Sequence, residues 1–230
     1  MKLLAIETSS IACSVALQVG NDIHEQHVVE AKAHTRILLP MIKQALAEEK
    51  LAIGDLDALV LGNGPGSFIG MRIGASVAQG LAFAAGLNIV PISSLAAVAA
   101  EVLSEHEESH VAVAQDARMN QVYLGCFARD EHDLPVALGV ERIHDIQEIE
   151  ILGDHNAVNW LAAGGGWSQY PALAELQTVT LRHVPDVLVP RAKQLLRLAR
   201  KSLESGAGIP PEQLQPAYLR DQVAKPPKSR

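Results

Sequence analysis

The order in which apolar runs follow one another is the feature of this sequence that most restricts its fold. Three runs of strand-like composition come first, at residues 3–7, 13–19 and 23–29. The turn between the last two, Gly20-Asn21-Asp22, is typical of a β-hairpin. From residue 34 the apolar spacing changes to three and four residues, which predicts an amphipathic helix over residues 34–49. Strand and helix signals then alternate, with a strand at 58–62, a helix at 71–85, a strand at 88–92 and a helix at 94–104.

This order predicts an α/β fold in which an antiparallel three-stranded meander is extended by parallel strands through crossover helices, as in RNase H-like domains. A second, similar unit follows, with strand signals at 111–116, 122–127, 137–143, 160–163 and 179–183. The polar stretch at 104–110 separates the two units. We therefore expect an N-terminal lobe over 1–104 and a smaller C-terminal lobe over 105–230. The second lobe is expected to include a closing helix at 190–205 and a basic, disordered tail from about residue 221.

Charge and composition restrict the partners that the chain can hold. It has 19 basic and 26 acidic residues, a formal net charge of −7, and only 3% aromatic residues. A surface that binds nucleic acid unaided usually has the opposite charge and exposed aromatic rings, so we expect RNA to be contacted through a partner. Cys13 and Cys126 are too few for a disulfide framework and lie in apolar runs, which favours a cytoplasmic location. No run of about 18 uncharged apolar residues predicts a membrane span.

A glycine-rich loop over residues 62–70 leaves a predicted strand and enters a predicted helix. Main-chain N–H groups at such a position can bind an anion. The loop lacks the Gly-Lys-Ser/Thr of a Walker A motif, and no Gly-x-Gly-x-x-Gly spacing fits it. A tight turn, which glycine makes without steric cost, is the favoured interpretation, and anion binding stays open.

Two polar motifs each have a chemical and a structural interpretation. Residues 106–110, His-Glu-Glu-Ser-His, match the zinc-protease pattern His-Glu-x-x-His. The apolar helix that would bury them ends near Leu103, so a solvated connector is favoured. Asp116 follows a predicted buried strand and precedes Arg118. It is either a catalytic acid or half of an Asp–Arg lock in a turn, and without a second carboxylate nearby the lock is favoured.

The predicted helix at 71–85 is apolar over most of its circumference, so it must be covered on several sides. The sheet and the helix at 34–49 can cover part of it. The rest is left either to packing within the domain or to another chain. Small residues recur every four positions on one side and larger apolar residues on another: Gly70, Gly74, Ala78 and Ala82, then Ile73, Val77, Leu81 and Ala84.

Six segments, spread over nearly the whole chain, together resemble the bacterial TsaB (YeaZ) family. They are residues 6–9, 13–17, 34–42, 64–74, 116–119 and 216–220. The glycine loop and the Asp-Ala-Arg-Met segment at 116–119 are the most specific of them. The resemblance implies a member of the actin/sugar-kinase/Hsp70 superfamily, with two RNase H-like lobes and mixed sheets, which agrees with the order of strands and helices.

The resemblance implies a non-catalytic but required subunit of the machinery that forms N6-threonylcarbamoyladenosine in tRNAs reading codons that begin with A. It implies a helix bundle with the transferase TsaD, participation of the ATPase TsaE, and a homodimer through the same helices when TsaD is absent. tRNA is then contacted only through the complex. The alternative is an ATP-binding, kinase- or ATPase-like enzyme of the same superfamily. The implied partner-binding residues are His34, Leu38, Met41, Ile42, Ala45, Met71, Gly74, Val77, Ala78 and Leu81.

The resemblance also bears on cofactors. TsaD carries a His-x-x-x-His metal pair at the start of the helix that here follows residues 88–92, and the corresponding positions are Ser94 and Val98. Neither side chain supplies an imidazole, so no metal site or catalytic residue is expected. The superfamily's phosphate-binding hairpin corresponds to Glu7, Thr8 and Ser9, and its second nucleotide loop to Gly164 and Gly165. Because Glu7 replaces the usual aspartate, we expect no tightly bound cofactor, with ATP or ADP possible within the full complex.

Overall fold

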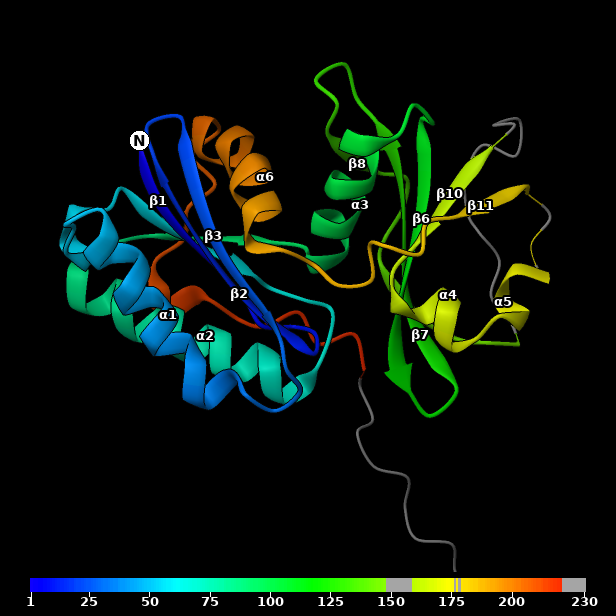
Figure 1. Cartoon of the computed structure of the whole chain (residues 1–230), viewed down its shortest axis with the longest axis horizontal. Helices are drawn as coiled ribbons and strands as arrows, with labels where there is room; N and C mark the ends of the chain where they lie inside the picture. The colour runs from blue at the N-terminus through cyan, green and yellow to red at the C-terminus, as the bar shows by residue number, and fades with distance from the viewer. Residues whose placement is uncertain (148–158, 176, 178, 221–230) are drawn as a thin grey trace, which may run out of the picture.

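The computed structural model describes residues 1–147, 159–175, 177 and 179–220, and these residues form two β-sheets with helices between and outside them (Figure 1). The first sheet has the strand order β3-β2-β1-β4-β5. Its first three strands are antiparallel, and β4 and β5 run parallel to β1. The strands are β1 (Lys2–Glu7), β2 (Ala12–Val19), β3 (Asp22–Val29), β4 (Ala58–Gly62) and β5 (Ile89–Ile92).

The second sheet repeats this topology. Its order is β11-β10-β6-β7-β8, and β9 also pairs with β7. β6 and β7 are antiparallel, whereas β10 is parallel to β6 and β11 is parallel to β10. The expected fold class, α/β with two RNase H-like lobes and mixed sheets, is thereby confirmed. The strands are β6 (His110–Arg118), β7 (Gln121–Arg129), β8 (Pro135–Ala137), β9 (Arg142–Asp145), β10 (Trp160–Ala163) and β11 (Leu181–His183).

Helices cover both faces of the first sheet (Figure 1). α1 (His34–Glu48) and α2 (Phe68–Ala85) lie side by side on its outer face, and α6 (Ala192–Glu204) covers its inner face. α3 (Ser94–Glu105) lies between the two sheets and packs on β6 and β7. The shorter elements are α4 (Gly165–Gln169), α5 (Ala172–Glu175) and the 3-10 helices η1 (Ile53–Asp55) and η2 (Pro211–Gln213).

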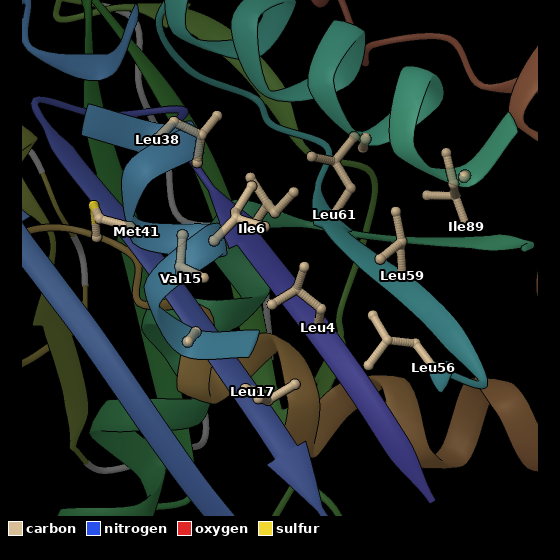
Figure 2. Packing of buried hydrophobic residues seen from close by; sticks show 14 of the residues in the cluster. Leu4, Ile6, Val15, Leu17, Leu38, Met41, Leu56, Leu59, Leu61 and Ile89 are labelled. Carbon is tan, nitrogen blue, oxygen red and sulfur yellow. The ribbon is translucent and has the colours of Figure 1, made fainter. Parts of the chain in front are cut away.

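An extensive apolar core lies between the first sheet and the pair α1 and α2. Residues of β1 alternate between the two faces: Leu4 and Ile6 enter this core, while Leu3 packs against α6. Figure 2 shows Leu38 and Met41 of α1 gathered with the strand side chains of this core. The inward side of α1 is therefore filled by the chain's own sheet.

The closing helix, expected in the C-terminal lobe, packs on the first sheet and on α3. α6 contacts β1, β2, β4 and β5. Leu195 and Leu196 are buried in the same core as Leu3 and Val60. The pattern of α6 identifies its apolar side, but sequence periodicity carries no information about which of two sheets that side covers. The proposed boundary near residue 104 stays a prediction.

Two further expectations differ from the structure. α2 begins at Phe68 instead of residue 71, because the hydroxyl of Ser67 accepts a hydrogen bond from the main-chain N–H of Gly70 and caps the helix earlier. The expected strand at 137–143 is replaced by the two short strands β8 and β9. The expected tail from residue 221 lies outside the described residues.

Residues 206–220, here called the C-terminal segment, return from α6 along the first lobe and end on the second. Ile209 forms a bridge with β5, and Leu214 is buried in the core beneath α2. Gln79 of α2 donates to the main-chain oxygen of Leu214 at 3.3 Å. Arg220 then donates to the main-chain oxygen of Ala117, in the second lobe, at 2.7 Å. The C-terminal segment therefore supports one flank of α2.

The first turn of α6 is capped by side chains of the first sheet, since its own N-cap residue, Arg191, makes no side-chain cap. The buried hydroxyl of Ser14 accepts from the main-chain N–H of Ala192 at 3.1 Å and donates to Glu25 at 2.9 Å. Glu25 also accepts from the main-chain N–H of Lys193 at 3.0 Å. These long-range caps fix where α6 meets the sheet.

We expect Ser14→Ala to lower the free energy of unfolding by about 1–2 kcal/mol, because the buried N–H of Ala192 loses its acceptor. Urea denaturation followed by circular dichroism measures the change. Ser76→Ala is the control: Ser76 is exposed in the middle of α2, where alanine is the better helix former. Equal unfolding midpoints for the two variants would contradict the role given to Ser14.

Candidate functional site

The polar groups at the end of β1 are used within the chain. Glu7, Thr8 and Ser9, here called the 7–9 turn, are buried. Glu7 Oε1 accepts from the main-chain N–H of Ser9 at 2.6 Å, and Oε2 accepts from the hydroxyl of Ser94 at 2.8 Å. The hydroxyl of Thr8 donates to the main-chain oxygen of Gly70 at 2.8 Å. The structure thus brings together the three residues expected at a phosphate site. Their polar atoms form hydrogen bonds with other groups of this chain.

The glycines of the 62–70 loop allow this loop to pack closely on the 7–9 turn. A Cβ at Gly66 would overlap the main-chain oxygen of Ser9, and one at Gly70 would overlap that of Thr8. The main-chain N–H of Ser67 donates to the same oxygen of Ser9 at 2.6 Å. These glycines are required for close approach of two backbone segments, so the structural interpretation of the loop is the one that the geometry supports.

Gly74 extends this contact one turn into α2, where a Cβ would overlap the hydroxyl of Thr8. Gly80, two turns further on, has open space where its Cβ would be. The small residues of α2 are therefore needed for different reasons. Close approach to the 7–9 turn explains only the glycines nearest to that turn.

The corresponding loop of the second lobe is also occupied internally. Gly164 has a φ of 96°, and a Cβ there would overlap the main-chain oxygen of Ala114. The main-chain N–H of Gly164 donates to Val187 at 2.9 Å, and that of Gly165 donates to Leu188 at 3.1 Å. Neither amide is left free to bind a phosphate in this arrangement.

Ser94, at the start of α3, connects the glycine loop to Glu7. Its hydroxyl accepts from the main-chain N–H of Gly64 at 3.2 Å while it donates to Glu7. Val98, one turn later, is fully buried. Within the described parts of the chain, no three His, Cys, Asp or Glu side chains are grouped so that they could hold a metal ion.

The two polar motifs have structural roles. His106 has extended backbone geometry at the end of α3, and His110 is the first residue of β6, so the His-Glu-x-x-His spacing does not lie on a helix. Asp116 accepts from the main-chain N–H of Arg118 at 2.8 Å and forms an ion pair with its guanidinium at 3.2 Å. The expected Asp–Arg lock is therefore present, and Tyr170 donates to it at 3.0 Å.

The structure places most of the expected partner-binding residues inside the chain's own core. Only Val77 and Leu81 are half-buried; the others are buried, and they are His34, Leu38, Met41, Ile42, Ala45, Met71, Gly74 and Ala78. His34, for example, bonds to the main-chain oxygen of Ala12 at 3.0 Å. A docking partner can touch these helices only through their other sides.

The uncovered side of α2 carries apolar residues that the sequence reasoning passed over. Ile69 is 70% exposed and Phe83 is 79% exposed. Ile73, Val77 and Leu81 are half-buried and pack against the apolar core beneath α2. Gly80 is exposed on the same side, and Ile69, Gly80 and Phe83 are called the outer α2 face. The signal that could have identified them was their position opposite the stripe of small residues.

By length and composition, α2 is also the one helix among the described residues that could cross a membrane, with a mean hydropathy of 1.3 over 18 residues. A third of it is buried within the chain. Arg72, in the same helix, keeps it from being an uncharged apolar run. Its composition is therefore explained by one side in the core and one apolar side left uncovered.

The fit of α2 against the 7–9 turn predicts opposite effects for two glycines of the same helix. Gly70→Ala should lower the free energy of unfolding by about 1–3 kcal/mol, since the new methyl group overlaps backbone. Gly80→Ala should raise it by about 0.5–1 kcal/mol, because space is open and alanine favours a helix. Chemical denaturation measures both, and a Gly70→Ala variant as stable as Gly80→Ala would contradict the packing described.

The buried carboxyl of Glu7 makes stability depend on pH. Burial raises its pKa above the ordinary value of 4.5, while hydrogen bonds from Ser9 and Ser94 act in the opposite direction. A carboxyl with a raised pKa in the folded state contributes stability below pH 4.5, and that contribution is lost as the pH rises through the folded-state value. The ionised Glu7 carboxylate therefore lowers the free energy of unfolding at neutral and alkaline pH.

We expect Glu7→Gln to gain stability relative to the unmodified chain as the pH is raised from 5 to 8, because glutamine keeps the shape without the charge. Urea midpoints at several pH values measure the difference. Other groups with raised pKa, such as Glu101, are the same in both proteins and cancel. A difference in stability that does not change with pH would show that the Glu7 carboxyl carries no burial penalty.

Comparison with known proteins finds a matching family model and similar proteins of comparable length. The family model for "TsaD: tRNA N6-adenosine threonylcarbamoyltransferase" matches residues 21–228. The "tRNA threonylcarbamoyladenosine biosynthesis protein TsaB" of Haemophilus influenzae is 35% identical over 229 residues, which cover 97% of this chain and 95% of that protein. The Escherichia coli protein of the same name is 34% identical over 230 residues, covering 97% and 96%.

Two Pseudomonas aeruginosa crystal structures have the same fold at 36% identity, each covering 95% of this chain and 99% of the other. One is described as an uncharacterized protein with similarity to peptidase YEAZ and has a TM-score of 0.88; the other is named YeaZ and has a TM-score of 0.86. Since identity exceeds 30% along nearly the full length of both proteins, this chain belongs to the TsaB (YeaZ) family.

Proposed function

We propose that this chain is a required, non-catalytic subunit in the formation of N6-threonylcarbamoyladenosine in tRNAs that read codons beginning with A. It docks on the transferase TsaD through the outer sides of α1 and α2 and works in the cytoplasm with the ATPase TsaE. tRNA is held by the complex and not by this chain alone. The observation that carries the proposal is the outer α2 face, which the chain's own fold leaves uncovered.

The chemistry of the outer α2 face supports docking of another protein. Ile69 and Phe83 are exposed at its two ends, with exposed Gly80 between them. Large apolar side chains left exposed on one side of a helix are surface that a partner protein can bury. Gly80 is exposed and has no neighbour within 4 Å of a Cβ position, so a partner helix can approach this side of α2 closely.

The non-catalytic role is supported by the way the polar groups of both nucleotide-type loops are used. Glu7 is fully buried and bonded to Ser9 and Ser94, so its carboxylate is not presented to a substrate. Gly164 and Gly165 donate their amides to the segment before α6. A role in complex formation needs none of these groups to be free.

We also propose that a second copy covers the outer α2 face when TsaD is absent. The family model named for TsaD matches most of this chain, so a similar pair of helices is expected in both proteins. The two partners would then compete for one surface. The homodimer and the complex with TsaD are therefore mutually exclusive states.

We expect Phe83→Glu to weaken binding to TsaD of the same organism at least tenfold while leaving the fold intact, because the ring is mostly exposed and a buried carboxylate would be unpaired. Size-exclusion co-elution and the rate of tRNA modification in a reconstituted mixture measure the effect. Val140→Glu is the matched control, since Val140 is 74% exposed in the second lobe. Unchanged co-elution of Phe83→Glu would reject this docking surface.

The ATPase-like alternative makes a separate prediction. The purified chain should then hydrolyse ATP, and Glu7→Gln should abolish the turnover. Our proposal predicts background hydrolysis for both proteins in a phosphate-release assay. Turnover that depends on Glu7 would replace the proposed role by an enzymatic one.

A further inference from the structure

One arginine of α2 is held in place by aromatic rings. The guanidinium carbon of Arg72 lies 3.7 Å from the centre of the Phe68 ring and 5.7 Å from that of Tyr218. Its Nε donates to the hydroxyl of Tyr218 at 3.0 Å, and the two rings lie 5.5 Å apart. Tyr218 belongs to the C-terminal segment, which brings it to the flank of α2. These three residues are called the Arg72 clamp.

The clamp leaves the outer edge of the guanidinium without a partner. Among residues 1–147, 159–175, 177 and 179–220, no acid forms an ion pair with Arg72, and its only hydrogen bond is the one from Nε to Tyr218. α2 has no acidic residue in its first turn, so Arg72 adds a positive charge near the positive end of the helix dipole. Both terminal nitrogen atoms are therefore available to an anion.

Arg72 lies on the same side of the helix as the outer α2 face. It follows Ile69 by three residues and precedes Phe83 by eleven, which is close to three full turns. Arg72 is itself exposed. A protein that covers Ile69 and Phe83 must therefore cover the Arg72 clamp as well.

A guanidinium removed from water without acceptors is costly, and the described part of this chain offers none to the two terminal nitrogens of Arg72. We propose that the partner docked on the outer α2 face presents a carboxylate that binds the two terminal nitrogens of Arg72. This inference rests on the proposed function and specifies a chemical requirement for the partner. Arginine, with its planar fork, forms two parallel hydrogen bonds to a carboxylate, which also fixes the register of docking.

A carboxylate of a protein fits this site better than a phosphate of RNA. The chain has a net charge of −7, which opposes unaided binding of a polyanion. Arg72 already covers a face of the Phe68 ring, so a base cannot stack there without displacing it. Exposed Ile69 beside the clamp supplies the apolar contact that accompanies an arginine anchor in protein interfaces.

Binding of TsaD to immobilised full-length chain, measured by biolayer interferometry at 50, 150 and 500 mM NaCl, tests the inference. Arg72→Gln should weaken binding about tenfold at 50 mM and reduce the salt dependence, because one charge-assisted contact is lost. Tyr218→Phe should weaken it several-fold, since the guanidinium loses its anchor. Arg200→Gln, an exposed arginine of α6 on the opposite face of the sheet, should behave as the unmodified chain.

The outcomes separate this inference from the proposed function. If Phe83→Glu abolishes binding while Arg72→Gln stays within twofold, the docking surface stands and the carboxylate contact is overturned. If Arg72→Gln weakens binding with an unchanged salt dependence, Arg72 acts through packing alone and the inference is also overturned. Weakening of only the homodimer, measured by sedimentation, would assign the carboxylate to a second copy; weakening of only tRNA binding would assign the anion to RNA.

Discussion

Close packing between the 7–9 turn and the glycine loop is the constraint on which the functional surface depends. The main chain of Ser9 and Thr8 fits against Gly66 and Gly70 with no room for a side chain. This contact fixes the start of α2, and the polar groups of the 7–9 turn are bonded within the chain. The same packing positions the helix on which the proposed docking surface lies.

Different parts of the chain pack against different sides of the remainder of α2. The first sheet and α1 cover its inward side, and the C-terminal segment covers one flank through Gln79 and Tyr218. The outer α2 face is what these supports leave uncovered. Because the C-terminal segment continues to Ala117 through Arg220, the flank of α2 is connected to the second lobe. The position of the clamp is thus set by both lobes.

Local periodicity predicted the two-lobed fold, but not the long-range contacts that define the site. The alternation of apolar runs is a property of neighbouring residues, so strands such as β1 and helices such as α1 could be recognised. Other features depend on residues far apart in sequence. They are the packing of α6 on the first sheet, the approach of Tyr218 to Arg72, and the fact that Leu38 is buried while Ile69 is exposed. The stripe of small residues on α2 indicated that another segment approaches this helix closely. It did not reveal that the segment belongs to the chain's own first lobe.

We propose that this chain acts by presenting a helix and not by chemistry at its buried carboxyl. The most direct measurement is the initial rate of N6-threonylcarbamoyladenosine formation in a reconstituted mixture in which Glu7→Gln replaces the unmodified chain. The account predicts the same rate, since the partner surface is unchanged and the side chain keeps its shape. A loss of modification by a folded Glu7→Gln chain that still binds TsaD would contradict it.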